Sequence, residues 1–412
     1  MSAVSLLAKL RATARSGASL AAIGLGFALP ISTAFDGLLL ALVLVLWFGS
    51  VPRWSEIRLL RHNPVAMASL GLFALCALGL TYGEGARDDG LMYLTKYIDL
   101  AFVPVFVLLF QAARARAAAI RAFEIAMLVT LVVSYLLAAG VLPWAPPLTA
   151  NPISGATAFK NQITHATFMA FAAFLFAQRA QASASTARRL LWGTACALAA
   201  ANVLFMVVGR TGYLVLFALT AVFCWRTFGA RGRSIAAALA IAVVAVGIGV
   251  PGKFADRVQL TVDQTRNWEY GNGVDTSIGD RLNFYATSLR IFRDNPVFGT
   301  GLGGFPRAFA RETAGTRIVV THNPHNQYLL FAAQLGSAGL AAFLGLLWTL
   351  WRSAPRIADR HEQLIAQGLF ATLAVGSVFN SFLLNHVEGL FFAWLAGLAC
   401  ATLGRRGESA AR

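Results

Sequence analysis

Long apolar runs, separated by short segments that hold most of the basic residues, are the feature that most restricts the fold of this chain. Charged residues make up 13% of the sequence and hydrophobic residues 58%, whereas soluble domains average about 25% charged residues. Because an apolar helix of roughly 20 residues crosses a bilayer, the runs predict an all-α, polytopic membrane protein with about twelve transmembrane helices. The predicted spans are 17–34, 37–51, 64–83, 91–111, 122–142, 164–178, 190–208, 212–227, 234–251, 326–350, 364–384 and 389–403.

The net charge of +16 is explained by where the basic residues lie, without a nucleic acid partner. They gather at alternate loops, as expected when Lys and Arg stay on the cytoplasmic side of a membrane. This positive-inside pattern predicts that both termini are cytoplasmic, that the number of spans is even, and that the protein lies in a bacterial inner membrane among membrane lipids. The groups of three lie at 9–15, 53–61, 114–121, 179–189, 226–233, 352–360 and 405–412.

One segment on the far side, residues 252–325, is much longer and more polar than the other loops. It divides the chain into helices 1–9 (residues 1–251), a periplasmic loop containing short helices, and helices 10–12 with a cytoplasmic tail (residues 326–412). The loop contains FGTGLGGF, which superficially resembles a phosphate-binding glycine loop. No predicted strand precedes it, so we interpret it as a tight turn that lets the backbone approach a neighbour.

Residues 278–294 of this loop have the spacing of an amphipathic helix that ends at Asn295-Pro296. Such a helix lies on the membrane surface or packs on its own loop, and the pattern favours neither. The apolar residues expected on one face are Leu282, Tyr285, Leu289 and Phe292.

Two arginines stand apart from the orienting groups. Arg210, in VVGRTGYLV, lies at the far-side junction of two predicted spans. A charge at membrane depth is costly and usually functional, although an arginine also extends to the headgroups. Arg281 lies near the start of the predicted loop helix and, taken alone, is more typical of a solvated surface residue.

The segment THNPHNQYLL contains His322 and His325. Asn323 is expected to cap a helix that begins at Pro324, which places His325 in the first turn. The positive end of the helix dipole then favours a neutral imidazole, which is competent as a general base. Two histidines three residues apart also suit a metal, but no acidic or cysteine cluster completes a site, and we expect neither metal nor cofactor.

Lys96 and Asp99 lie one turn apart inside a predicted span. They either neutralise each other or line a polar cavity, and both interpretations stay open. The far-side loops contain no D-x-D and no clustered carboxylates of the kind that hold a divalent cation on a diphosphate. Arginines bind a diphosphate without metal, because guanidinium is always charged and pairs with phosphate through two hydrogen bonds.

Three stretches in order, GRTGYLVL, SIGDRLNFYATSLRIFRDNPVFGTGLGGF and HNPHNQYLLFAAQLGSAGL, are similar to the O-antigen ligase and O-antigen polymerase superfamily. The resemblance implies metal-independent transfer of a glycan from undecaprenyl diphosphate at the periplasmic face. Arg210 and Arg281 match the family's diphosphate-binding arginines, and His325 matches its catalytic histidine in the H-N-x-Y-L pattern. His322 is an additional histidine beside it. We expect further substrate contacts from His322, Asn326, Lys96 and Lys160.

The span count and the single long loop before the last three spans resemble the ligase more than the polymerases. The resemblance then implies transfer of O-antigen to lipid A–core oligosaccharide, with inversion at the anomeric carbon and the long loop as a catalytic lid. The histidine would accept the proton of the acceptor hydroxyl, while the arginines stabilise the departing diphosphate. The alternatives are an O-antigen polymerase, a pilin O-oligosaccharyltransferase and, from another class, a secondary transporter.

Overall fold

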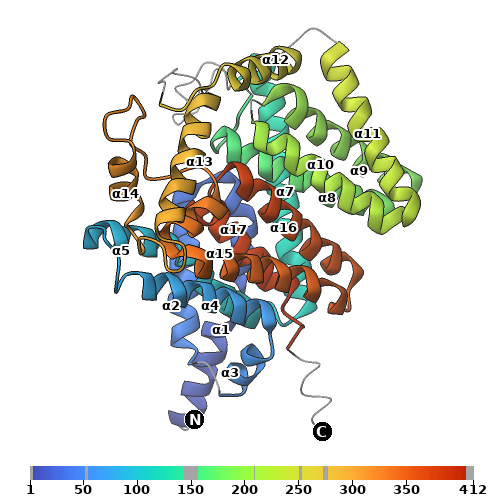
Figure 1. The fold of residues 1–412 in the computed structure, drawn as a ribbon. Coiled ribbons are helices and arrows are strands. Elements are labelled where there is room, and N and C mark those ends of the chain that lie inside the picture. Colours follow the sequence, from blue (N-terminus) through green and yellow to red (C-terminus); the bar gives the residue numbers. More distant parts are fainter. Residues whose placement is uncertain are drawn as a thin grey trace.

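The protein is an all-α polytopic membrane protein, as the apolar runs predict. The computed structural model describes residues 3–51, 54–142, 156–207, 209–249, 253–271 and 277–404. Every regular element in these ranges is a helix, and the helices of the long loop lie along the top and left of the bundle (Figure 1). Seven helical segments within these ranges are long and apolar enough to cross a membrane, and three apolar helices are shorter. The count of twelve spans stays a prediction.

Most predicted spans correspond to one helix, and the long loop contains α12, α13 and α14. A π-helix (Asn202–Met206) continues α9, and 3-10 turns follow α15 (Ala354–Arg356) and precede α17 (Phe382–Leu384). The helices are α1 (Ala3–Ile31), α2 (Thr33–Gly49), α3 (Trp54–Arg61), α4 (Pro64–Gly79), α5 (Arg87–Lys96), α6 (Asp99–Leu109), α7 (Ala113–Ala138), α8 (Gln162–Ala182), α9 (Thr186–Ala201), α10 (Arg210–Phe228), α11 (Ala230–Gly249), α12 (Lys253–Arg266), α13 (Ser277–Asp294), α14 (Phe305–Glu312), α15 (Gln327–Ser353), α16 (Arg360–Phe379) and α17 (His386–Ala399).

The predicted span at 91–111 corresponds to one candidate membrane span, Arg87–Leu109, which is made up of two helices, α5 and α6. They meet at Tyr97, which is fully buried and accepts a hydrogen bond of 3.0 Å from Nε2 of Gln327 in α15. The break leaves Asp99 at the start of α6, away from the lysine that precedes it. Hydropathy is continuous across the break, so the apolar pattern could not locate it.

Aromatic side chains fill the centre of the bundle, where α7, α8 and α17 meet. Phe123 of α7 packs against Phe168 of α8 and Phe391 of α17 at ring-centroid distances of 6.0 and 5.5 Å. Trp394 is fully buried, and its indole N–H donates a 2.8 Å hydrogen bond to the Ala22 carbonyl of α1. Large buried rings of this kind dominate core energetics, and they hold the helices that carry the polar residues described below.

The glycine-rich turn clamps the long loop to the bundle through its backbone, which confirms the interpretation of FGTGLGGF. Gly299, Gly301 and Gly303 all have positive φ, at 67°, 76° and 88°. Between them, Thr300 N–H donates to the Ala333 carbonyl of α15 at 3.0 Å, and Leu302 N–H donates to the Gly79 carbonyl of α4 at 2.9 Å.

A kink in α15 receives the same segment. Gly336 interrupts the helix at φ 64° and ψ −156°, and Ser337 N–H donates to the Pro296 carbonyl at 2.8 Å. A Cβ at Gly336 would lie 2.3 Å from the Val297 backbone, so only glycine fits this contact. The long loop therefore joins α15 by a close backbone approach, to which the Thr300 hydroxyl adds a 3.2 Å hydrogen bond to the Ala333 carbonyl.

Helix α13 forms where the sequence predicts it and ends before Asn295, but its predicted inner face is wrong. Leu289 is 44% exposed, whereas Asn283, Thr287 and Ile291 are buried. The polar members of this face have partners: Trp268 Nε1 donates to Asn283 Oδ1 at 3.1 Å, and a 3.2 Å hydrogen bond joins Thr287 to Tyr270. Helix α13 packs against α12, α14 and α15, so it lies on its own loop and on the bundle.

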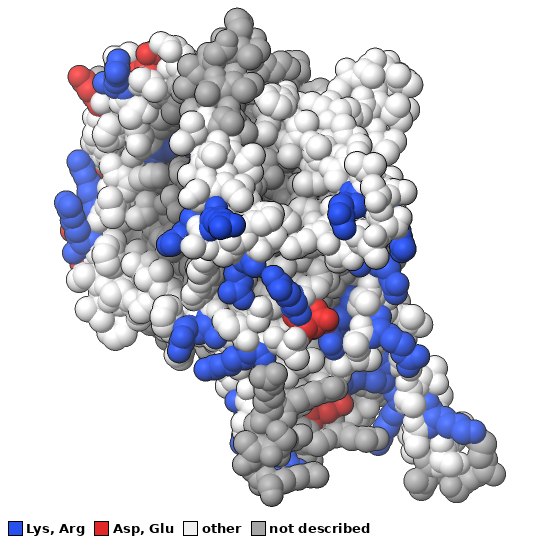
Figure 2. Space-filling model, turned by 90° about the vertical axis from the view of Figure 1, so that its right-hand side faces the viewer, with Lys and Arg blue, Asp and Glu red and all other residues white. Residues whose placement is uncertain are grey.

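Basic side chains crowd the lower half of the face in Figure 2, the half toward which α1 begins in Figure 1. Their orientation in a membrane stays a prediction, but some have a second role that the pattern did not reveal. Arg116 is 6% exposed and joins α7 to α16 through an ion pair of 2.5 Å with Glu362. Its guanidinium also donates to the carbonyls of Phe110 and Gln111, both at 3.0 Å.

Candidate functional site

The loop before α15 places His325 in an unusual backbone conformation. The prediction that Asn323 caps a helix starting at Pro324 is wrong: α15 begins at Gln327, and Asn326 caps it by accepting from Leu329 N–H at 3.0 Å. His325 therefore precedes the helix, with a positive φ of 55°. A non-glycine residue in this region is strained by roughly 1–3 kcal/mol and persists only where its surroundings hold it, often at functional sites.

Hydrogen bonds from both sides hold this loop. Oδ1 of Asn323 accepts from His325 N–H at 2.8 Å and from the Ser381 hydroxyl at 2.7 Å. Gln327 extends the link, because its Oε1 accepts from Leu383 N–H at 3.0 Å. The segment between α16 and α17 thus holds the loop of the strained histidine through hydrogen bonds. No local sequence pattern predicts these contacts.

Helix α13 covers His325 from the other side. The Phe284 ring lies 6.3 Å from the imidazole, and the Tyr285 hydroxyl donates to the Val378 carbonyl at 2.9 Å. Burial lowers the pKa of His325 below its ordinary value of 6.5, the positive charge of Arg281 lowers it further, and a hydrogen bond with Asn380 opposes both. The imidazole is therefore neutral at pH 7, for a different reason than the helix dipole that the sequence suggested.

Arg281 thus lies close enough for its charge to act on His325. Nδ1 of His325 is buried and has no hydrogen-bond partner among the described residues. Arg281 is half-buried and forms no ion pair with another described residue. A neutral imidazole beside an unneutralised guanidinium can accept a proton and stabilise a nearby anion.

Arg210 is the first residue of α10, and its side chain lies outside the described residues. The backbone around it is described: Gly209 and Gly212 pack against Gln162 and Ala166 at the start of α8. The prediction that Arg210 joins Arg281 and His325 stays a prediction.

The remaining predicted residues are spread out. His322 has an exposed side chain, and its carbonyl accepts a hydrogen bond from the Tyr93 hydroxyl. Lys96 is exposed at the end of α5, and among the described residues no ion pair joins it to Asp99, the first of the two interpretations left open. Asp99 is buried and lies 3.3 Å from Nδ1 of His386, a partner nearly three hundred residues away in the chain. Because the two residues lie so far apart in the sequence, no local motif predicts their contact.

His386 belongs to a cluster of buried charged side chains that the sequence analysis did not predict. One member, Lys160, was expected there only as a substrate contact. Lys160 Nζ lies 3.2 Å from Oδ2 of Asp36 and 2.7 Å from the Thr33 hydroxyl. The other oxygen of Asp36 lies 3.6 Å from Nε2 of His386. Lone charges inside apolar runs were the available signal, because such residues rarely face lipid unpaired.

Glu388 extends this cluster along α17. Its Oε1 accepts a hydrogen bond of 2.5 Å from the Thr164 hydroxyl of α8, and its side chain is 5% exposed. The cluster therefore joins the starts of α2, α6 and α17 to the beginning of α8. We define it as the buried ionic cluster, made up of Asp36, Asp99, Lys160, His386 and Glu388.

Comparison with known proteins identifies the part of the chain that holds the site. Residues 195–344 match the family model described as O-antigen ligase. No curated protein matches the chain. The matched range contains Arg210, Arg281 and His325, together with α13, the glycine-rich turn and the kink of α15. The stretch of this membrane protein that carries the candidate site is therefore similar to the O-antigen ligase family.

Proposed function

We propose that the protein is a metal-independent glycosyltransferase that joins O-antigen, carried on undecaprenyl diphosphate, to lipid A–core oligosaccharide at the periplasmic face. The observation that supports it most is a half-buried His325 whose pKa is lowered by burial and by the nearby positive charge of Arg281, inside the matched stretch. Neither residue is neutralised by an acidic side chain within the described part of the chain. Such a pair suits a reaction that removes one proton and releases one anion.

In this proposal His325 accepts the proton of the acceptor hydroxyl as the oxygen attacks the anomeric carbon. The bond from that carbon to the phosphate oxygen breaks, and the diphosphate leaves with the electron pair. Attack opposite the leaving group inverts the anomeric centre. Arg281, with Arg210, stabilises the charge that develops on the diphosphate, a contribution typically worth a factor of 10² to 10³ per group. Both substrates carry lipid, so they reach the site from the bilayer.

Lipopolysaccharide from a strain that lacks the protein tests the proposal. Loss of all O-antigen from lipid A–core, with accumulation of the lipid-linked polymer, supports the ligase. A ladder reduced to single repeats identifies a polymerase instead. Normal lipopolysaccharide with unglycosylated pilin identifies a pilin O-oligosaccharyltransferase, and normal products throughout overturn glycosyl transfer.

His325→Ala expressed in that strain tests the site itself, with His322→Ala as the matched control. We expect His325→Ala to abolish transfer while its amount in the membrane, measured by immunoblot, stays unchanged. His322→Ala should keep its activity because that side chain is exposed. The reverse result would move the base to His322. Transfer by purified protein should also survive EDTA, and rescue only by a divalent cation would refute the metal-free mechanism.

A further inference from the structure

A cavity of about 500 Å³ lies between α7, α8 and α9, far along the chain from the candidate site. Its lining has two chemical parts, a basic part and an apolar part. Three arginines and one glutamate form the first, and small residues of the loop after α8 form its edge. The lining residues are Arg121, Glu124, Ile125, Leu128, Arg179, Ala182, Ser183, Ala184, Arg188 and Trp192.

Two of the three arginines that line the cavity form no ion pair with another described residue. Glu124 accepts from both Nε and Nη2 of Arg179, at 2.8 and 3.0 Å, so this pair is neutral. Arg121 and Arg188 remain, and both side chains are exposed. Two guanidinium groups at one cavity are suited to a phosphate oxyanion, which they bind through charge-assisted hydrogen bonds.

The apolar part runs away from the arginines in the same direction on both helices. On α7, Ile125 and Leu128 follow Arg121 at helical spacing, and on α9 Trp192 follows Arg188 by one turn. Ile125 is 54% exposed. The apolar track continues on α7 through Val129 and Val132, which are 40% and 57% exposed. A free phosphate has no apolar part that could pack on these side chains, whereas a phospholipid has a phosphate followed by acyl chains.

We propose that this cavity binds the phosphate headgroup of an anionic phospholipid, with one acyl chain lying along α7. Both arginines belong to the basic groups that the positive-inside pattern places on the cytoplasmic side, where basic pockets between transmembrane helices bind anionic headgroups. The site is separate from the candidate active site and does not rest on the proposed function.

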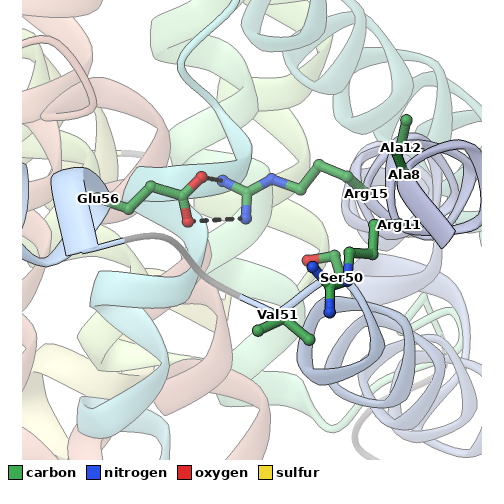
Figure 3. Close-up of a pocket in the computed structure, with 7 residues that line it drawn as sticks. All are labelled: Ala8, Arg11, Ala12, Arg15, Ser50, Val51 and Glu56. Atoms are coloured by element: carbon green, nitrogen blue, oxygen red, sulfur yellow. Dashed lines mark hydrogen bonds and ion pairs between the residues drawn. The ribbon is translucent and has the colours of Figure 1, made fainter. Parts of the chain in front are cut away.

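A second cavity, drawn in Figure 3, lacks the two features that suit the first cavity to a phospholipid. This one, of about 450 Å³, lies between α1, α2 and α3. Its Arg15 faces Glu56 at 3.1 Å, which leaves Arg11 as its other basic lining residue. Alanine side chains and Val51 are its apolar lining, and no aromatic side chain contributes. Beside the Arg15–Glu56 pair it has one arginine, Arg11, and its lining holds no row of large apolar side chains. It therefore serves as the control site.

Quenching of Trp192 fluorescence by brominated lipid tests the proposal on the purified full-length protein in detergent micelles. Subtracting the signal of Trp192→Phe isolates this tryptophan. We expect brominated phosphatidylglycerol to quench it at lower lipid fractions than brominated phosphatidylcholine does. The double variant Arg121→Gln, Arg188→Gln should weaken phosphatidylglycerol binding roughly thirtyfold. Arg11→Gln at the control cavity should leave it unchanged.

Equal quenching by both lipids, or an unaltered affinity in the double variant, would overturn the proposal. Complete displacement of the brominated lipid by inorganic phosphate would also overturn it, by assigning the site to a free anion. Both substituted side chains are exposed and the Arg179–Glu124 pair remains, so the thermal unfolding midpoint should stay unchanged. If that midpoint nevertheless falls, Arg121→Lys with Arg188→Lys keeps the charge and should retain lipid binding.

Discussion

Two polar regions share the segment between α16 and α17 but differ in how their charges are used. At its start, Asn380 and Ser381 contact the His325 loop. Directly after it, at the start of α17, His386 and Glu388 belong to the buried ionic cluster. The first region leaves its cation unpaired within the described residues, and the second sets each buried aspartate against a cation or an imidazole.

This difference separates a charge that is available to a substrate from a charge that holds helices together. Burial alone does not make the distinction, because Lys160 is more deeply buried than Arg281. Pairing does, since a neutralised charge has little field left for a ligand and an unpaired one keeps it. Variants in the buried ionic cluster should change stability, and variants beside His325 should change activity.

Lys160→Ala should have the largest effect on stability. It leaves Asp36, which is fully buried, with only the more distant His386 as a partner. Breaking a buried pair typically costs 3–5 kcal/mol, and we expect about 3 kcal/mol here because His386 remains. Thermal unfolding in detergent measures the loss.

The double variant Asp36→Leu, Lys160→Met is the matched control, because it removes both charges together. Its stability should recover most of the loss. If Lys160 contacts substrate instead, the double variant will be stable and inactive, and the two regions will no longer be distinct.

Arg281→Ala should reduce transfer by a factor of 10² to 10³ and leave the unfolding midpoint unchanged. The guanidinium forms no ion pair among the described residues, so its loss uncovers no buried charge. Rates with purified lipid-linked donor measure the effect. A fall in stability comparable with that of Lys160→Ala would show that Arg281 is structural.

Transfer should keep its rate as the pH falls through 6.5 and decline only at a lower pH. Burial and Arg281 lower the pKa of His325, so the imidazole stays neutral, and competent as a base, below the ordinary histidine value. The same shift contributes stability that is present above about pH 6.5 and is lost as the pH falls through the folded-state value. In Arg281→Ala the decline should move to higher pH, and an unmoved profile would remove Arg281 from the vicinity of His325.

Lys96→Ala should have the smallest effect, on stability and on transfer alike. Its side chain is exposed and Asp99 faces His386 without it. Surface substitutions usually change stability by no more than about 0.5 kcal/mol. The same rate and unfolding measurements check this, and a loss of transfer would return Lys96 to the substrate contacts that the sequence suggested.

Hydropathy and residue spacing were sufficient to predict most of the helices and the loop helix α13, because these depend on local pattern, whereas the roles of Arg210, Arg281 and His325 stay predictions. They were insufficient for contacts between distant segments. Asp36 and Lys160 lie 124 residues apart, and nothing near either one indicates the other. The buried face of α13 was missed because Asn283 and Thr287 have partners, Trp268 and Tyr270, that hydropathy does not register.

The clamp between the glycine-rich turn and α15 has a consequence for exchanging parts between related proteins. Most of its hydrogen bonds run from backbone to backbone, with one from the Thr300 hydroxyl to the Ala333 carbonyl, and its glycines have no room for a Cβ. A chimaera that receives only the long loop of a relative would meet α4 and α15 with unmatched partners. Grafts should succeed when Gly79, Gly83 and Gly336 are retained together with the turn, whatever the glycan specificity of the donor protein.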